Sequence, residues 1–436
     1  MRLDYASREP RAGTWTVDGR LLVLLLVGAG LRLGWIAHVP TDDAAIDRLP
    51  DQREYLELGR SLLNGDGLVF VDPRFTDTVY AYRAPAYPWL IALCQADLHV
   101  IRVVQALLDT LTILGAYILA RRWLDKGPSV FAAFVVMINP FLIYFCGLIL
   151  SETLFTAMLV WGMALLVMRR PADLNAAPRW GIAWWCGAIL LSFSILVRPS
   201  AIALPVVLGI AAAFVNRDWR LPYDWRWTPP VATLMVLLTA LVLLPWGWRN
   251  HRILGSWVWT TTNGGITLYD GLNPDATGAS NQSFVRTMPQ LRSMNEVDRS
   301  KYLADLAWQF VREHPDRALQ LSIIKIARTI SPIPLSEEYG RNPRTLIVAA
   351  TYMIPLYVLV VMGLWLAPAG RSIKVYLLAP ALYFIVAHSV SVGSLRYRIP
   401  ADVPMTIIAA MGAASLKRRN DQIPMTNKAP MPNEQG

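Results

Sequence analysis

Long apolar runs recur along the chain and are separated by polar segments. A run of about 17–25 mostly apolar residues is long enough to cross a bilayer as a helix. By this rule the pattern predicts roughly ten membrane helices. They cover residues 21–39, 99–120, 129–147, 151–168, 181–197, 200–215, 230–248, 345–367, 373–390 and 401–416. We therefore expect an all-α, polytopic membrane protein.

A short helix that is too polar to cross a bilayer is predicted just after the first span. The stretch LPDQREYLELGRSLLNGD at 49–66 places Tyr55, Leu58 and Leu62 at helical spacing, which gives one apolar face. Asp51 stands in its first turn, where an acid is favourable. Such a helix is typical of the membrane interface.

The distribution of basic residues along the chain predicts which segments face the cytoplasm. The chain is 54% hydrophobic and 17% charged, with a net charge of +10. Alternate turns between spans are basic, and they hold Arg121, Arg122, Arg169, Arg170, Arg217, Arg220, Arg371, Lys374 and Lys417–Arg419. Positive residues favour the cytoplasmic side. The positive charge thus indicates topology, and no nucleic-acid partner is expected.

This predicted topology divides the chain into cytoplasmic, membrane and outer parts. The predicted parts are a cytoplasmic segment 1–20, a membrane region 21–248 with a first outer loop 40–98, a large outer loop 249–344, C-terminal membrane helices 345–416 and a disordered cytoplasmic tail 417–436. The two long loops share one face, whereas the cytoplasmic turns are short. We therefore expect the function on the outer face of the membrane.

Polar residues gather where the spans meet the outer side. They are Asp42, Asp43, Asp51, Arg83, Glu152, Arg198, Arg249, Asn250, Asn263, Arg396 and Arg398. Ionisable groups at membrane depth are costly and are usually paired or functional. Several arginines close to acids suit an anionic head group, and a lipid phosphate is the obvious candidate.

Structural alternatives stay open for these residues. Asp51 could only complement a helix N-terminus, and Glu152 could only cap the helix that it begins. Arg198 could anchor a span at the interface. Arg396 and Arg398 could form a basic rim that touches lipid head groups.

A metal site is weakly indicated. Asp42 and Asp43, with Asp47, could hold a divalent cation through oxygen ligands, although clustered acids in loops are commonly just solvated. The five histidines show no paired spacing typical of zinc. No cofactor is required by the sequence, and a divalent cation stays an alternative.

Several segments, in order, resemble one family. They are PDQREYLELGRSLLNGDG, YRAPAYPWLIAL, NPFLIYFCGLILSETLF, LVRPSAIALP, PWGWRNHRILGSWVWTTTNGG, LYDGLNPDATG and RYRIPADVP. They are similar to signatures of the polyprenyl-phosphate-dependent membrane glycosyltransferases of the GT-C fold, in particular the bacterial family 39-type enzymes. That family includes the lipid A aminoarabinose transferase and relatives of protein O-mannosyltransferases. Arg83 stands where the lipid A enzymes have lysine, and nothing clearly supplies their acid–histidine metal pair. The lipid A substrate and a zinc requirement are therefore not carried over.

The resemblance implies transfer of a sugar, with inversion, from a polyprenyl phosphate to a hydroxyl of a lipid, glycan or protein, at the outer face of a bacterial inner membrane. A phosphate leaves as a stable anion, so this step needs one base and several cations rather than two carboxylates. In this interpretation Asp51 is the base, with Asp42 or Asp43 as alternatives, and Glu152 positions substrate or a metal. The expected substrate-binding residues are Tyr55, Tyr82, Arg83, Arg198, Arg249, Asn250, Asn263, Arg396 and Arg398.

Two other classes of function compete with this interpretation. A transporter or flippase of lipid-linked sugars would favour inverted repeats and polar sites at the membrane midplane. No repeat is evident, and the polar groups cluster at the outer ends of the spans. A purely structural membrane protein gives no reason for so many arginines there.

Overall fold

Long apolar helices make up most of the protein. The structure, a computed structural model, describes residues 19–168, 181–215, 228–335 and 342–421. Within these ranges six helices are long and apolar enough to cross a membrane. They are α1 (Gly19–Ile36), α5 (Leu98–Arg121), α11 (Thr228–Leu254), α16 (Pro343–Leu366), α17 (Arg371–Ser389) and α18 (Ile399–Asp421). The all-α expectation for a polytopic membrane protein is confirmed.

Shorter apolar helices stand at the other predicted spans. They are α6 (Lys126–Met137), α7 (Pro140–Phe145), α8 (Glu152–Leu166), α9 (Ile182–Ser194) and α10 (Leu204–Val215). The run at 129–147 is divided, because Asn139 caps α7 by accepting hydrogen bonds from the backbone N–H groups of Phe141 and Leu142. A total of about ten spans therefore stays a prediction.

The C-terminal helix lies at the centre of the membrane bundle. The apolar stretch of α18 is 78% buried and packs against α6, α8, α16 and α17. Its approach to α16 is close, because a Cβ on Gly363 would lie 2.0 Å from the Ile408 carbonyl oxygen. The helix continues to Asp421, so residues 417–421 are helical where a disordered tail was expected. Residues 422–436 lie outside the described part of the chain.

The first outer loop is more structured than expected. It contains α2 (Asp43–Asp47), α3 (Pro50–Asn64), an antiparallel hairpin of β1 (Phe70–Asp72) and β2 (Asp77–Val79), and α4 (Ala86–Leu93). The predicted interfacial helix is α3, which starts at Pro50 and ends at Gly65 in the left-handed conformation. The hairpin was not anticipated.

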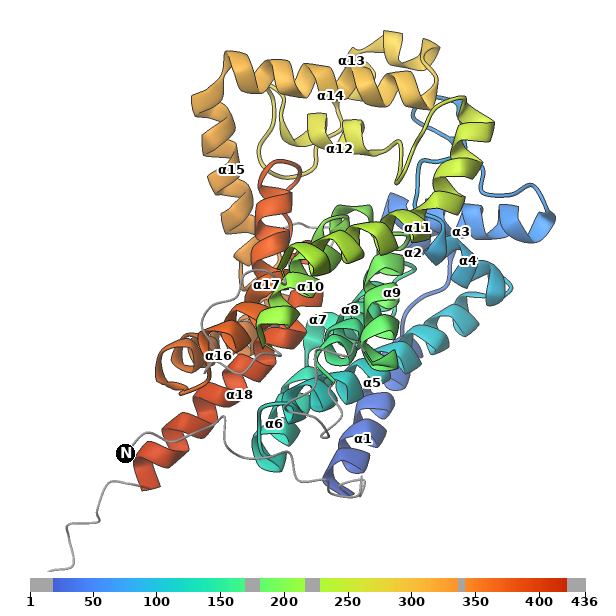
Figure 1. Ribbon diagram of the computed structural model, residues 1–436. Coiled ribbons are helices and arrows are strands. Elements are labelled where there is room, and N and C mark those ends of the chain that lie inside the picture. Colours follow the sequence, from blue (N-terminus) through green and yellow to red (C-terminus); the bar gives the residue numbers. More distant parts are fainter. Residues whose placement is uncertain (1–18, 169–180, 216–227, 336–341, 422–436) are drawn as a thin grey trace, which may run out of the picture.

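The second outer loop folds as a helical layer on one end of the molecule (Figure 1). It contains α12 (Gly264–Gly271), α13 (Phe284–Thr287), η3 (Pro289–Ser293), α14 (Glu296–Glu313) and α15 (Pro315–Ile330). Two residues of α14 join it to the first loop. The Glu296 carboxylate accepts from the backbone N–H of Tyr80, and Arg299 forms an ion pair of 2.7 Å with Asp77. The two outer loops therefore form one interlocked unit.

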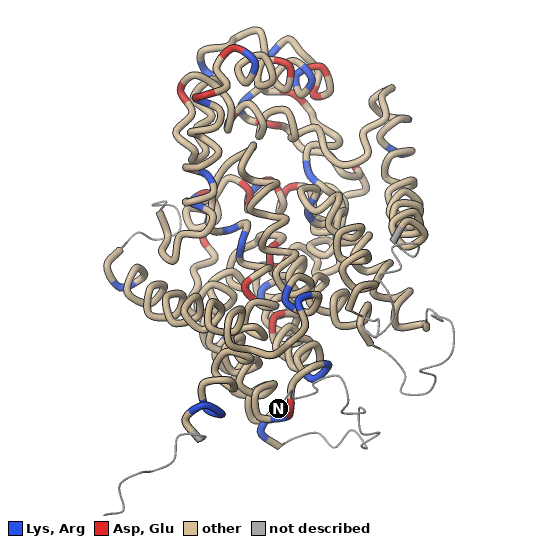
Figure 2. The backbone as a smooth tube through the Cα atoms, turned by 60° about the vertical axis from the view of Figure 1, so that its left-hand side comes forward, with Lys and Arg blue, Asp and Glu red and all other residues tan. Residues whose placement is uncertain are grey.

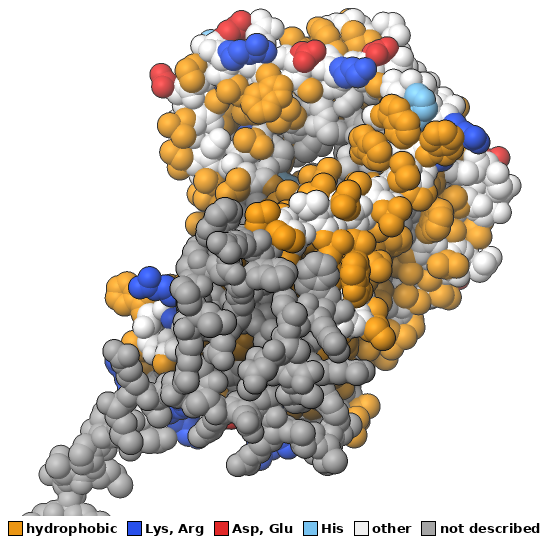
Figure 3. Space-filling model, in the orientation of Figure 1, with side chains coloured by type: hydrophobic (Ala, Val, Ile, Leu, Met, Phe, Trp, Pro, Cys, Tyr) orange, Lys and Arg blue, Asp and Glu red, His pale blue; other side chains and the backbone are white. Residues whose placement is uncertain are grey.

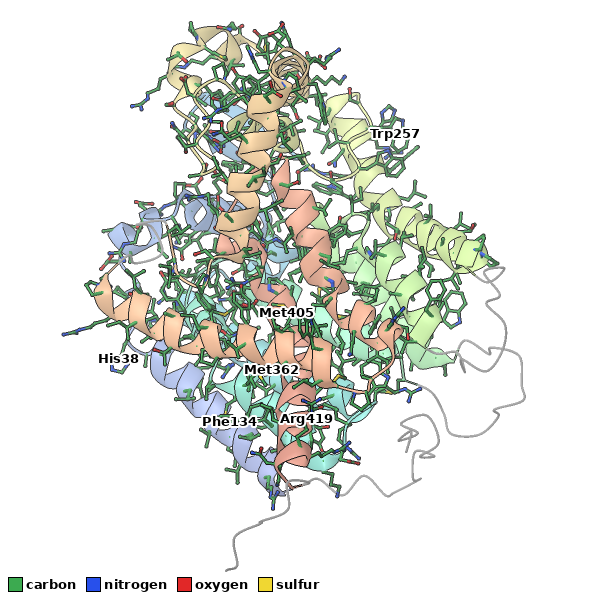
Figure 4. All side chains as sticks on the ribbon, turned by 90° about the vertical axis from the view of Figure 1, so that its left-hand side faces the viewer. His38, Phe134, Trp257, Met362, Met405 and Arg419 are labelled. Carbon is green, nitrogen blue, oxygen red and sulfur yellow. The ribbon has the colours of Figure 1, made fainter. Side chains whose placement is uncertain are left out.

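The two ends of the bundle differ in chemistry. Figure 2 shows acidic and basic residues mixed over the end that carries α12–α15. Much of the visible helix surface below that end is hydrophobic in Figure 3. Trp248, Trp257 and Trp259 are exposed close to the end of α11, as in an interfacial aromatic belt; the Trp257 and Trp259 rings are stacked, and Trp248 lies at a tilt to Trp257. Trp257 and the basic Arg419 lie at opposite ends of the molecule (Figure 4).

These features predict that the layer of α12–α15 faces away from the cytoplasm. Single cysteines at the exposed positions Ser293 and Asn420 test this in a variant whose native Cys94, Cys146 and Cys186 are replaced by alanine. In intact cells, an impermeant maleimide should label S293C, whereas N420C should react only after the cells are permeabilised. The cysteine-free parent is the control. The reverse pattern would invert the topology.

Candidate active site

A carboxylate held between two guanidinium groups lies at the start of α3. The two Asp51 oxygens accept separate hydrogen bonds, one from Arg83 Nη2 at 2.5 Å and the other from Arg396 Nη1 at 2.6 Å. Arg83 precedes α4, and Arg396 lies in η5 (Leu395–Tyr397), the turn that leads into α18. The carboxylate thus does more than complement a helix end, because it joins segments 345 residues apart.

Glu152 lies on the other side of Arg396. Its side chain is 1% exposed and accepts a hydrogen bond from Arg396 Nε, while Arg198 Nη1 lies 3.5 Å from the same oxygen. The other carboxylate oxygen is buried and has no hydrogen-bond donor among the described residues. Arg198 also lies over the Phe155 and Tyr397 rings. The beginning of α8 therefore supplies more than a helix cap.

A second acid on α3, Glu54, was missed by the sequence-based predictions. Arg83 Nε donates to Glu54 at 2.7 Å, and Arg74 Nη2 lies 3.6 Å from its other oxygen. Glu54 follows Asp51 by three residues, so the helical spacing that places both on one face was a usable signal. Arg74, in the turn between β1 and β2, gave no comparable signal.

Together these side chains alternate in sign along a continuous series, which we call the charged cluster. It runs Arg74, Glu54, Arg83, Asp51, Arg396, Glu152, Arg198. Burial raises the pKa of Asp51, but the positive charges of Arg83 and Arg396 outweigh this and hold its pKa well below the usual range. Burial raises the pKa of Glu54 despite the opposing charge of Arg83.

Aromatic rings flank the middle of the charged cluster. The Arg83 guanidinium carbon lies 5.3 Å from the ring centres of both Tyr55 and Tyr82. The Tyr82 hydroxyl accepts a hydrogen bond of 2.5 Å from Arg74. The structure thus brings seven of the residues named from the sequence together: Asp51, Tyr55, Tyr82, Arg83, Glu152, Arg198 and Arg396.

Three other residues named from the sequence lie outside the charged cluster. Arg249 donates to the carbonyl oxygens of Tyr80 and Leu68, and Asn250 donates to that of Val258. Asn263 precedes α12, where its side chain makes no cap. Arg249 and Asn250 thus support the fold around the charged cluster, and among the described residues Asp51 forms its side-chain ion pairs with Arg83 and Arg396 instead.

Arg398 also lies apart from Asp51, although only one residue separates it from Arg396. Its side chain is buried and is paired with Asp402 at 2.9 Å, and it donates to the Ser331 carbonyl oxygen. Successive residues of η5 point in different directions, so only Arg396 joins the charged cluster. Arg398 instead ties α18 to the end of α15.

The acidic residues that follow the first span form contacts outside the charged cluster. Asp42 caps α2 by accepting from the backbone N–H of Ala45, and Asp43 and Asp47 both pair with Arg53 at 2.7 Å. Across the described residues, no group of three or more His, Cys, Asp or Glu side chains is placed to hold a metal ion. Asp42 and Asp43 therefore offer neither a formed cation site nor a contact with the charged cluster.

The fold matches solved structures closely enough to identify it. The archaeal oligosaccharyltransferase AglB of Archaeoglobus fulgidus, in complex with an inhibitory peptide and a dolichol-phosphate, aligns with a TM-score of 0.55 and 14% identity over 94% of this chain and 52% of AglB. The same enzyme tethered to an acceptor peptide aligns with a TM-score of 0.56 at 16% identity. The chain has the GT-C fold.

Curated relatives agree with the GT-C assignment. The undecaprenyl phosphate-alpha-4-amino-4-deoxy-L-arabinose arabinosyl transferase of Pseudomonas paraeruginosa is 28% identical over 251 residues, 55% of this chain and 41% of the relative. The second transferase of this name in Pseudomonas fluorescens is 32% identical over 146 residues, which cover 30% and 24%. The matches thus cover less than half of the relatives' length. No protein-family model matches the sequence.

The geometry predicts that Arg396 is essential for stability. Its removal in Arg396→Ala would leave the buried Glu152 and the partly buried Asp51 each short of a positive partner. Truncating one partner of a buried ion pair typically costs about 3–5 kcal/mol, so unfolding should occur at a clearly lower temperature. Thermal unfolding of the purified protein, followed by tryptophan fluorescence, measures this. Arg53→Ala, which breaks only exposed pairs, is the control and should leave the unfolding temperature nearly unchanged.

Proposed function

We propose that the protein transfers a sugar from a polyprenyl-phosphate donor to a hydroxyl group of an envelope lipid, glycan or protein, at the outer face of a bacterial cytoplasmic membrane. The observation that carries this proposal is Asp51, a carboxylate held between Arg83 and Arg396 beside the interlocked outer loops. The names of the curated relatives, all arabinosyl transferases that use undecaprenyl phosphate, support the donor class.

In the proposed reaction, an acceptor hydroxyl attacks the anomeric carbon from the side opposite the phosphate. The new carbon–oxygen bond forms as the bond to the phosphate oxygen breaks, and the electron pair leaves with the phosphate. Asp51 takes the hydroxyl proton. No acid is needed for the leaving group, because a lipid phosphate departs as a stable anion that Arg83 and Arg396 can bind.

The low pKa of Asp51 fits this scheme only if the donor changes its surroundings. A carboxylate with two guanidinium partners is a weak base. A phosphate that takes over Arg83 or Arg396 would remove one of these partners from Asp51, and its pKa would rise. Donor binding and activation of the base are thereby linked in the proposal.

The remaining cluster residues take supporting roles. Glu152 and Arg198 orient Arg396 through the contacts at the start of α8. Tyr55 and Tyr82 flank Arg83, where the sugar would lie next to the phosphate. We leave Arg249, Asn250 and Arg398 out of the donor site because their side chains support loops and helix ends, and Asn263 because, within the described part of the chain, its side chain shows no contact with the charged cluster.

The base assignment predicts a large kinetic effect of Asp51→Asn. Asparagine cannot accept the proton, and loss of a general base typically lowers the rate by about 10²–10⁴-fold. Mass spectrometry of envelope glycolipids and glycoproteins, from cells with and without the protein, identifies the product and then compares the variants. Asp42→Asn and Asp43→Asn are matched controls and should retain normal product. Near-normal turnover of Asp51→Asn at equal protein level would rule Asp51 out as the base.

The phosphate assignment predicts different effects of two arginine substitutions on donor affinity. Arg83 also spans two acids, Asp51 and Glu54, but the lipid A enzymes have lysine at this position, so Arg83→Lys should weaken the binding of undecaprenyl phosphate only a few-fold. Arg396→Lys loses the fork that spans Asp51 and Glu152 and should weaken it by about tenfold or more. Binding to purified protein in nanodiscs measures both. Unchanged affinity in both variants would show that the phosphate binds elsewhere.

A further inference from the structure

A basic cavity lies between the two outer loops, beyond the Arg74 end of the charged cluster. Its volume is about 500 Å³, which is in the size range of small-molecule sites. The first loop contributes Arg74, and the second contributes Asn281, Gln282, Ser283, Arg286 and Arg292. The interlocked loops therefore build this cavity jointly.

The lining of the cavity is suited to an anion that also carries hydroxyl groups. Three guanidinium groups face it with two amides and a hydroxyl, and no acidic side chain is among the lining residues. Arg286 and Arg292 are exposed and make no ion pair with any described residue. Guanidinium groups favour phosphate and carboxylate, whereas amides and hydroxyls bind sugar hydroxyls.

A short series of side-chain contacts links the cavity to Asp51, the proposed base. Arg74 donates to Gln282 at 2.7 Å inside the cavity, and the same guanidinium approaches Glu54 at 3.6 Å. Glu54 in turn contacts Arg83, which contacts Asp51. A molecule held in the cavity thus lies on the side of Asp51 away from Arg396 and Glu152.

We propose that this cavity is an acceptor subsite that takes a saccharide bearing a phosphate or carboxylate group. The proposal rests on the glycosyl-transfer function above. Arg286 and Arg292 bind the anionic group, and the amides beside them orient the saccharide so that its chain extends past Arg74 and Glu54 towards Asp51. The donor phosphate binds at Arg83 and Arg396, the two arginines that flank the base.

Binding of glucose 6-phosphate to the full-length protein in nanodiscs tests the subsite, with glucose as the matched neutral probe. Glucose 6-phosphate should bind at least about tenfold more tightly than glucose, and R286Q/R292Q should abolish the difference. The control K301Q/R312Q removes the same charge from exposed positions on α14 and should keep it. Equal binding of the two sugars, or equal loss in the control, would overturn the proposal.

A second pair of measurements distinguishes a failure of the acceptor subsite from a failure of the proposed donor site. R286Q/R292Q should bind undecaprenyl phosphate like the wild type, yet yield about tenfold less of the sugar-modified envelope product. Normal product despite lost glucose 6-phosphate binding would overturn the acceptor role. If the wild type itself fails to bind undecaprenyl phosphate, the proposed function fails instead.

Changing the lipid of the nanodisc tests whether the anionic group bound in the cavity belongs to a lipid or to a glycan. Glucose 6-phosphate binding is compared in phosphatidylcholine and in phosphatidylglycerol. If phosphatidylglycerol displaces the sugar phosphate, lipid-borne phosphates reach the subsite and a glycolipid acceptor is supported. If it does not, the subsite takes a glycan that projects from the membrane surface.

Discussion

The ion pairs of Asp51 with Arg83 and Arg396 determine how the loop-bearing half of this protein is assembled. Asp51, Glu54 and Glu152 are three carboxylates in a small, largely buried volume, where like charges repel strongly. Arg83 and Arg396 lie between these carboxylates and offset the repulsion. Each arginine comes from a different segment, so the first loop, η5 and the region before α10 must all be in place for any of them to be stable.

The same constraint explains why the outer loops are ordered so precisely. Arg74 closes the charged cluster only because the β1–β2 hairpin is held by Arg299 on α14, and Glu296 fixes the segment after the hairpin. Arg249 and Asn250 secure the end of α11 against those loops. Residues distant from the proposed chemistry therefore contribute by fixing the positions of the charged side chains.

The GT-C fold positions the helices and loops, and our functional proposals rest on the charged cluster and on the cavity between the loops. Similarity to an oligosaccharyltransferase at 14% identity establishes the fold and leaves the acceptor undetermined. In the proposal, Arg83 and Arg396 beside Asp51 bind the donor phosphate, and Arg286 and Arg292 in the cavity bind the acceptor. On this view, donor and acceptor are distinguished by which arginines they contact rather than by separate domains.

The sequence by itself determined the features that depend on local composition. Apolar runs and a proline-led amphipathic segment predicted an all-α membrane protein and the position of α3, because burial in lipid and helix ends depend on neighbouring residues, while the number of spans stays a prediction. The same reasoning found Asp51, Glu152 and the polar outer ends. It missed Glu54, although the helical spacing from Asp51 was available.

Which arginines meet Asp51 was decided by the tertiary structure. Arg83, Arg249, Arg396 and Arg398 look alike in sequence, since each lies in one of the predicted outer segments or within a few residues of the span that borders it. Only Arg83 and Arg396 reach the carboxylate, while Arg249 binds loop carbonyls and Arg398 turns towards Asp402. The direction of a side chain in a short turn depends on how distant helices pack, and that information is not contained in its own neighbourhood along the chain.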